Sequence, residues 1–156
     1  MTRTDYFHDP AAPTPNSIKV AVSAVVKDEL GRILMIRRTD NDMYSIPGGA
    51  LEAGETVSEA VVREVKEETG IDVRITGMVG VFSNPDHVIA YDDGEVRQEF
   101  SICFHADPIG GELRTSDESK EVEWIAPQEL SSRDIHPSIA LRIEQSLNRG
   151  DTPYFT

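Results

Sequence analysis

Three glutamates crowd into the last turns of a predicted helix, and no other feature constrains the chain as strongly. They are Glu64, Glu67 and Glu68 in the segment "REVKEETGI", residues 63–71. At about 100° per residue, the three carboxylates continue the stripe that apolar residues fill in the first half of the helix, so they face inward. Like charges three and four positions apart, near a helix end where the dipole disfavours them, cost roughly 1–3 kcal/mol.

A divalent cation would offset that cost. Ligands made only of oxygen favour Mg²⁺ or Mn²⁺ over zinc, so the helix predicts a divalent-metal site. The alternative is a surface cluster bridged by Arg63, which lies four residues before Glu67. The loop before the helix, "PGGALEAGE", is rich in glycine. Such loops let the backbone approach a phosphate or a metal closely, although most are only turns.

The ends of this helix and the remaining elements can be read from local signals. Thr56 is a suitable N-cap and makes a capping box with Glu59, and Gly70 suits the residue just beyond the C-terminus. Strands are predicted at 18–27, 32–38, 71–82 and 121–127, with a hairpin over 88–107 that turns at Asp93-Gly94. A short helical turn starts at 127, and a final helix over 136–150 has Gly150 beyond its end. This order favours an α/β sandwich with a mostly mixed sheet.

The chain of 156 residues suggests one domain over 18–150, with a tail at 151–156. Residues 1–17 contain three prolines and are predicted to form an irregular N-terminal arm. This arm is either a surface tail or a segment that reaches across a partner in a homodimer.

Composition limits the partners and the compartment. The formal net charge of −13 disfavours binding to nucleic-acid polymers and anionic membranes, although a small anion could bind at a local cation. Cys103 is the single cysteine, so neither an intrachain disulfide nor a cysteine-based metal site is expected. No apolar segment suits a signal peptide or a membrane span, and we expect a cytoplasmic location.

Together these residues resemble the Nudix hydrolases. The family pattern is G-x(5)-E-x(7)-R-E-U-x-E-E-x-G-U, where U is aliphatic, and the chain matches every specified position from Gly49 to Ile71. The resemblance implies an α/β/α sandwich and Mg²⁺-dependent hydrolysis of a nucleoside diphosphate linked to another group. A carboxylate site with metal ions suits this reaction because it neutralises the diphosphate and activates water near neutral pH.

The resemblance also implies roles for single residues. Glu64, Glu67 and Glu68, with the backbone carbonyl of Gly48, would hold Mg²⁺, for which Mn²⁺ can substitute. Arg63 would orient these carboxylates, and Glu55 would hold Arg63 and the loop.

Two further site residues are expected outside the helix. Arg38, at the end of the second strand, matches a position that often contacts substrate phosphate, although it can also be an ordinary exposed arginine. An additional glutamate should precede the strand that contains Trp124. Glu118 lies six residues before this tryptophan and is the first choice, and Glu121 is the second. The general base is one of Glu64, Glu67, Glu68 and Glu118, and the sequence does not rank them.

Substrate signals lie outside the helix and disagree. Pro85 lies 15 residues after Gly70, close to a proline position common in ADP-ribose pyrophosphatases. The "PGG" before the helix instead resembles members that cleave nucleoside triphosphates. We favour ADP-ribose-like substrates slightly, with (deoxy)nucleoside triphosphates as the alternative. A non-catalytic ligand-binding module is a third possibility, but such modules usually lose residues of the pattern. The four histidines show no metal-binding spacing, and His87 either lines a substrate loop or lies on the surface.

Overall fold

The computed structural model describes residues 2–148 and 152–156, so the predicted stop at Gly150 lies outside the described residues. Its elements are, in order, β1 (Arg3–Phe7), β2 (Ser17–Ile18), β3 (Ala21–Val26), β4 (Ile33–Arg38), β5 (Tyr44–Ser45), β6 (Gly48–Ala50), α1 (Val57–Thr69), β7 (Ile71–Phe82), β8 (His87–Tyr91), β9 (Val96–Gln98), β10 (Ser101–Gly111), β11 (Ser119–Ile125), the 3-10 helix η1 (Pro127–Ser132), α2 (Pro137–Leu147) and β12 (Tyr154–Phe155). Neither α1 nor α2 is long and apolar enough to cross a membrane.

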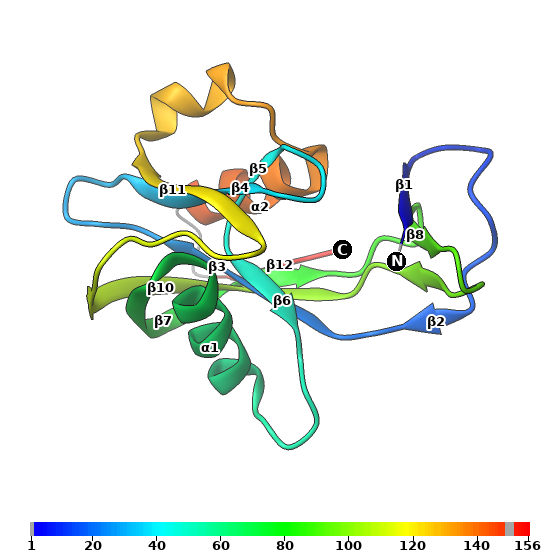
Figure 1. The fold of residues 1–156 in the computed structure, drawn as a ribbon, viewed down its shortest axis with the longest axis horizontal. Coiled ribbons are helices and arrows are strands. Elements are labelled where there is room, and N and C mark those ends of the chain that lie inside the picture. Colours follow the sequence, from blue (N-terminus) through cyan, green and yellow to red (C-terminus); the bar gives the residue numbers. More distant parts are fainter. Residues whose placement is uncertain (1, 149–151) are drawn as a thin grey trace.

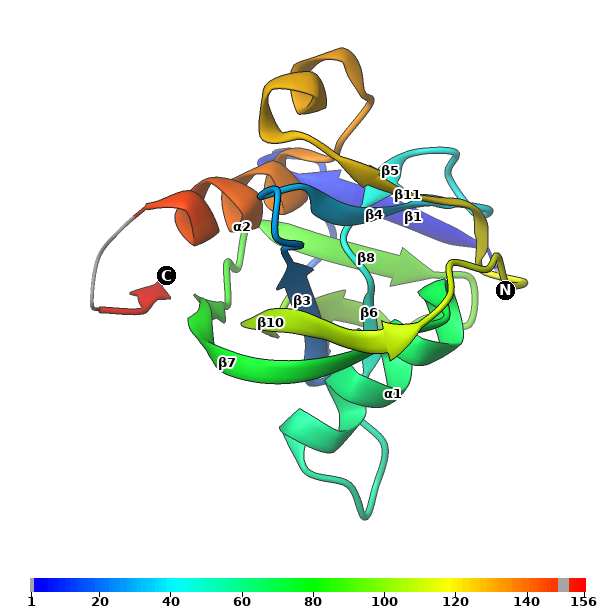
Figure 2. The same ribbon diagram turned by 90° about the vertical axis from the view of Figure 1, so that its left-hand side faces the viewer.

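A mixed sheet forms the centre of the molecule, with strand order β12-β7-β10-β3-β6. Strand β10 runs parallel to β3 and antiparallel to β7. Figures 1 and 2 show α1 on one face of this sheet and α2 on the other. The predicted α/β sandwich with a mixed sheet is therefore confirmed.

Strand β3 explains why the sequence reads as a continuous apolar run at this point. Val22, Ala24 and Val26 pack in the cluster that includes the buried residues of α1. Val25 packs in the cluster on the opposite face, together with Ile143 of α2. A central strand that is buried on both faces carries apolar residues at successive positions rather than at alternate ones, and within β3 Ser23 is the exception.

A second, smaller sheet has the order β11-β4-β5 and packs above the central one. Leu34 of β4 joins the α1 cluster, whereas Ile33 and Met35 join the α2 cluster. The register places Arg38, the last residue of β4, opposite Ser119 of β11. This pairing brings the end of β4 beside Glu118, whose carbonyl accepts a hydrogen bond from the Thr39 amide at 3.1 Å.

The prediction that residues 1–17 are irregular is corrected by a third sheet, of order β1-β8-β9-β2. Arg3–Phe7 forms a strand that pairs antiparallel with β8 of the same chain. Ser17–Ile18 pairs in parallel with β9, and the strand predicted to start at residue 18 therefore begins at Ala21. Figure 1 shows these strands beside the central sheet.

The local sequence does not predict β1, because "RTDYF" is short and largely polar. The strand forms because it pairs with the free edge of β8, about 80 residues later in the chain. In the predicted C-terminal tail, Tyr154–Phe155 pairs in parallel with β7.

Candidate active site

Helix α1 begins and ends where the sequence predicts. The Thr56 hydroxyl accepts a hydrogen bond from the Glu59 amide at 3.1 Å, and the Glu59 carboxylate accepts one from the Thr56 amide at 3.4 Å, which completes the capping box. Gly70 ends the helix with a φ of 80°. A Cβ there would lie 2.1 Å from the carbonyl oxygen of Glu112, so only glycine fits this position without displacing the backbone.

Two of the three glutamates face inward as predicted. Glu64 and Glu68 are 9% and 3% exposed, whereas the Glu67 side chain is 59% exposed. Burial, together with the charges of Glu64 and Glu118, raises the pKa of Glu68 to about 8, although the Gly48 amide and Arg38 act against this. Burial also raises the pKa of Glu64, against the effect of Arg63. Without a bound cation, the surroundings therefore disfavour the charged forms of both carboxylates.

Arg63 supplies part of the compensation and has the geometry expected of an orienting residue. Its Nη1 donates to Glu64 at 2.9 Å and lies 3.3 Å from Glu67. Its Nη2 and Nε donate to the two oxygens of Glu55 at 2.7 and 3.0 Å. The hydrogen bonds to Glu55 raise the pKa of Arg63, so this side chain keeps its charge. The arginine bridge considered from the sequence is thus present, but it covers Glu64 and Glu67 only.

Glu68 is the carboxylate without a cation partner. Within the described part of the chain it makes no ion pair, and it accepts a hydrogen bond from the Gly48 amide at 3.0 Å. A buried carboxylate beside another, held by a single backbone donor, matches the donor set of a divalent-metal site better than that of a surface cluster. The residues present therefore fit a hard divalent cation.

Two glycines of β6 occupy positions where a Cβ would meet close neighbours. A Cβ on Gly49 would lie 2.4 Å from Cδ of Glu64, and one on Gly48 would lie 2.3 Å from the carbonyl oxygen of Val22. Any larger residue would displace the Glu64 carboxylate or the neighbouring strand. The glycine-rich loop thus lets backbone and carboxylates share one small volume.

A cavity of about 520 Å³ opens beside these groups and includes Gly48, Glu64, Arg38 and Glu118 in its lining. Arg38 is held by Asp40, to which its Nε and Nη2 donate at 2.8 and 2.6 Å. Among the described residues, the lining contains five of the chain's 15 lysines and arginines but only four of its 28 acidic residues. The cavity is thus less acidic than the rest of the molecule, which suits an anionic ligand.

The structure separates the two glutamates that the sequence proposed as additional site residues. Glu118 lines the cavity, and its charge contributes to the raised pKa values of Glu64 and Glu68. Glu121 instead accepts a hydrogen bond from the Tyr44 hydroxyl at 2.7 Å and one from Arg37 at 3.1 Å. Glu118 is therefore the better placed of the two.

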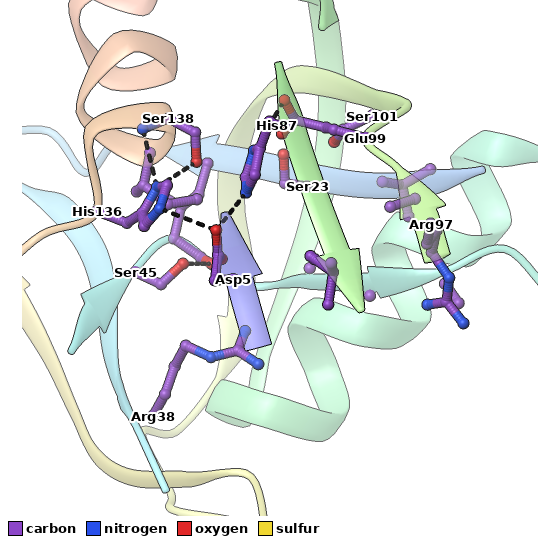
Figure 3. Close-up of a pocket in the computed structure, with 18 of the residues that line it drawn as sticks. Asp5, Ser23, Arg38, Ser45, His87, Arg97, Glu99, Ser101, His136 and Ser138 are labelled. Carbon is purple, nitrogen blue, oxygen red and sulfur yellow. Dashed lines mark hydrogen bonds and ion pairs between the residues drawn. The ribbon is translucent and has the colours of Figure 1, made fainter. Parts of the chain in front are cut away.

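Arg3, Asp5 and His136, which sequence reasoning did not assign to a site, also line this cavity, and so does His87, for which the sequence left a substrate loop and the surface open. Asp5 Oδ1 lies 3.0 Å from His87 Nε2 and 3.5 Å from His136 Nε2 (Figure 3). His87 Nδ1 lies 3.2 Å from Glu99, which also pairs with Arg142. His87, His136 and Asp5 offer ligand atoms within 4.8 Å of one another, which the sequence spacing of the histidines does not reveal.

In this structure these three side chains are linked by hydrogen bonds and ion pairs. The Nδ1 atom of His136 accepts a hydrogen bond from the Ser138 amide at 3.1 Å, so in the neutral ring the proton is on Nε2, which faces Asp5. Burial would lower the pKa of His87, but hydrogen bonds to Asp5 and Glu99 outweigh it and raise the pKa to about 9. Both imidazoles thus present N–H groups to Asp5, and the cluster is an ion-pair network.

The comparisons with known proteins identify the family of this chain. The NUDIX domain profile matches residues 17–145. A MutT-like protein of Streptomyces ambofaciens is 42% identical over 122 residues, which cover 78% of this chain and 73% of that protein. An ADP-ribose pyrophosphatase of Methanocaldococcus jannaschii is 42% identical over 113 residues, which cover 67% of this chain and 60% of that protein.

A comparison with solved structures also finds this fold. An ADP-ribose pyrophosphatase from Streptococcus suis matches with a TM-score of 0.67 at 23% identity, covering 88% of this chain and 98% of that one. The profile match includes the whole glutamate helix and most of the chain. On these grounds the chain belongs to the Nudix hydrolase family.

Proposed function

We propose that this Nudix hydrolase cleaves the diphosphate of a nucleoside diphosphate linked to another group, with ADP-ribose-like compounds as preferred substrates. One observation carries the reaction class: buried glutamates, Glu64 and Glu68, lie next to a cavity that Arg38 also lines. The volume of about 520 Å³ falls in the range of small-ligand sites, roughly 300–1,000 Å³.

The preference for ADP-ribose-like substrates rests on two supports. The first is the 42% identity to the ADP-ribose pyrophosphatase of M. jannaschii. The second is β8, where His87, Ile89 and Tyr91 alternate along the strand and all line the cavity. Pro85 is exposed and lies outside that lining, so it no longer supports this preference.

Each residue has a defined part in the proposed reaction. Glu64, Glu67, Glu68 and the carbonyl of Gly48 would hold Mg²⁺, or Mn²⁺ in its place. When bound, such an ion would neutralise charge on the diphosphate and make water a better nucleophile near neutral pH. Arg63, fixed by Glu55, keeps the carboxylates of Glu64 and Glu67 in place.

Two further roles are binding of the substrate phosphate and removal of a proton from the attacking water. Arg38 binds a substrate phosphate, for which its planar guanidinium is suited. One of the four glutamates, Glu64, Glu67, Glu68 or Glu118, accepts the proton of the attacking water. Glu118 is the member of this set that comes from outside the helix, and it adds a carboxylate on another wall of the cavity.

Glu118→Gln tests that assignment. We expect this variant to lower kcat by about tenfold to a hundredfold, because a carboxylate that binds metal or accepts a proton is lost. Glu121→Gln is the matched control, since it removes the same charge three residues along the chain, and it should stay within about threefold of wild type. Steady-state kinetics on the best substrate measure both effects. A larger fall in kcat for Glu121→Gln than for Glu118→Gln would make Glu121 the additional site residue.

A nucleotide panel tests the substrate class. We expect Mg²⁺-dependent release of AMP from ADP-ribose, with the highest kcat/KM among nucleoside diphosphate derivatives and (deoxy)nucleoside triphosphates. The "PGG" loop favours the second candidate, a triphosphate pyrophosphohydrolase, and highest kcat/KM on triphosphates with ADP-ribose untouched would establish it. Cleavage of no compound in the panel would instead favour a non-catalytic ligand-binding module. The homodimer and the cytoplasmic location stay predictions, and light scattering checks the first.

A further inference from the structure

Strand β1 is the part of the cavity wall that the proposed reaction leaves unused. In the antiparallel pairing with β8, Arg3 lies opposite Tyr91, Asp5 opposite Ile89 and Phe7 opposite His87. Directly opposed residues of such a pair point to the same face of the sheet. Arg3 and Asp5 therefore share the face of β8 that lines the cavity, which agrees with their place in its lining.

Arg3 lies beside the arginine already assigned to phosphate binding. Its Nη1 is 3.9 Å from Oδ2 of Asp40, and Arg38 donates to that same oxygen at 2.6 Å. The other contact of Arg3 is an ion pair with Asp5 at 3.6 Å. Both contacts are longer than a hydrogen bond, so the N–H groups of Arg3 remain available to a ligand. The Arg3 side chain is 33% exposed, the same fraction as that of Arg38.

The strand that carries Arg3 is held to the rest of the chain by side-chain contacts of Asp5 and Phe7. Phe7 packs edge-on against the rings of His87 and His136, with centroids 5.4 and 5.2 Å away. Asp5 points between the same two imidazoles (Figure 3), with Oδ1 at 3.0 Å from Nε2 of His87 and 3.5 Å from Nε2 of His136. The network thus fixes β1 in position and turns the Asp5 carboxylate toward the imidazoles. An arginine held on a rigid strand loses less freedom when it binds a ligand than one on a mobile tail.

We propose that Arg3 is a second phosphate-binding arginine of the active site, placed beside Arg38 by strand β1. The two guanidiniums would each contact one phosphate of the diphosphate, and Asp40 sets the spacing between them. This inference rests on the proposed function, because it assumes a diphosphate substrate. It also gives the N-terminal segment a role within its own chain.

Arg3→Ala tests the proposal through KM and through a binding measurement. A lost charge-assisted hydrogen bond of about 1.5–3 kcal/mol corresponds to a fall in kcat/KM of about tenfold to a hundredfold. We expect most of it in KM, because the residue binds a phosphate and lies away from the glutamates. Arg3→Lys should recover part of the loss, since a lysine keeps the charge without the planar fork.

The matched control is Arg74→Ala. Arg74 also pairs with one aspartate at 3.6 Å, Asp107, but it is 67% exposed on β7 and does not line the cavity. Its loss should leave kcat/KM within about twofold of wild type. Melting temperatures of all variants show whether Arg3→Ala keeps the fold, and equal damage from Arg74→Ala would overturn the proposal.

Calorimetric titration with inorganic pyrophosphate separates this inference from the proposed substrate. Wild type and Arg74→Ala should bind the probe alike, and Arg3→Ala should bind it at least about fivefold more weakly. Pyrophosphate bound equally by wild type and Arg3→Ala, or by neither protein, overturns the role of Arg3. If wild type binds pyrophosphate through Arg3 but cleaves no ADP-ribose-like compound, the proposed substrate fails and the phosphate site stands.

Discussion

Glu67→Gln and Glu68→Gln are each expected to lower kcat on the best substrate by at least about a hundredfold. Each change keeps the size of the side chain and removes one negative charge from the proposed metal site. The loss acts at the transition state, where the charge of the diphosphate must be neutralised. Glu68 is buried and accepts a hydrogen bond from the Gly48 amide, whereas Glu67 is largely exposed. The two variants therefore test one buried and one exposed carboxylate of the proposed metal site.

Glu144→Gln provides the control for these variants. Glu144 is an exposed residue of α2 outside the cavity lining, so its replacement changes the net charge equally but leaves the site intact. Circular dichroism and melting curves establish that each variant is folded before its turnover is compared. Near-wild-type turnover of either Glu67→Gln or Glu68→Gln would show that the metal ligands are assigned wrongly.

Millimolar Mg²⁺ is expected to raise the melting temperature of the wild-type protein by more than NaCl of matched ionic strength does. A ligand that binds only the folded state stabilises it by about 2.7 kcal/mol at a hundred times its Kd, which is about 5–10 °C for a chain of this size. The physical reason is the crowding of Glu64 and Glu68, which burial and mutual repulsion disfavour in their charged form. A bound cation relieves that repulsion, and screening by salt does so only weakly in a buried site.

Glu64→Gln should reduce the Mg²⁺ shift and raise the stability of the metal-free protein. The substitution removes the central charge of the cluster, and Arg63 keeps its bonds to Glu55. Melting curves of both proteins in EDTA, NaCl and MgCl₂ measure these effects without any knowledge of the substrate. Equal shifts of the melting temperature in NaCl and MgCl₂ would show that the glutamates form an arginine-bridged cluster and not a metal site.

The sequence determined the helix and its carboxylates because every contact that defines them is local. The capping box joins Thr56 to Glu59, and Gly70 takes the left-handed conformation that other residues rarely adopt. The periodicity of 3.6 residues places Glu64 and Glu68 on the buried side whatever the helix packs against. The strands buried on both faces, such as β3, were also predicted, since their apolar runs need no knowledge of their partners.

The sequence ranked Glu118 before Glu121 only through the family spacing to Trp124, because strand alternation could not decide where the sheet is irregular. The pairing of β11 with β4 shifts register between Ser119 and Glu121, so strict alternation fails at this point. Glu121 consequently reaches Tyr44 and Arg37, whereas Glu118 reaches the cavity. A bulge of this kind depends on the partner strand, and residues near in sequence do not specify it.

The N-terminal wall of the cavity was decided by tertiary structure alone. Arg3 and Asp5 belong to a short polar segment with no strand signal of its own, and they enter the site because β8 offers a free edge. His87 and His136 are 49 positions apart in the sequence and stack at 5.0 Å once β8 and the start of α2 converge. Local periodicity fixes which side of an element a residue occupies. Only the packing of distant elements fixes what that side faces, because those contacts join residues whose order along the chain carries no information about their distance.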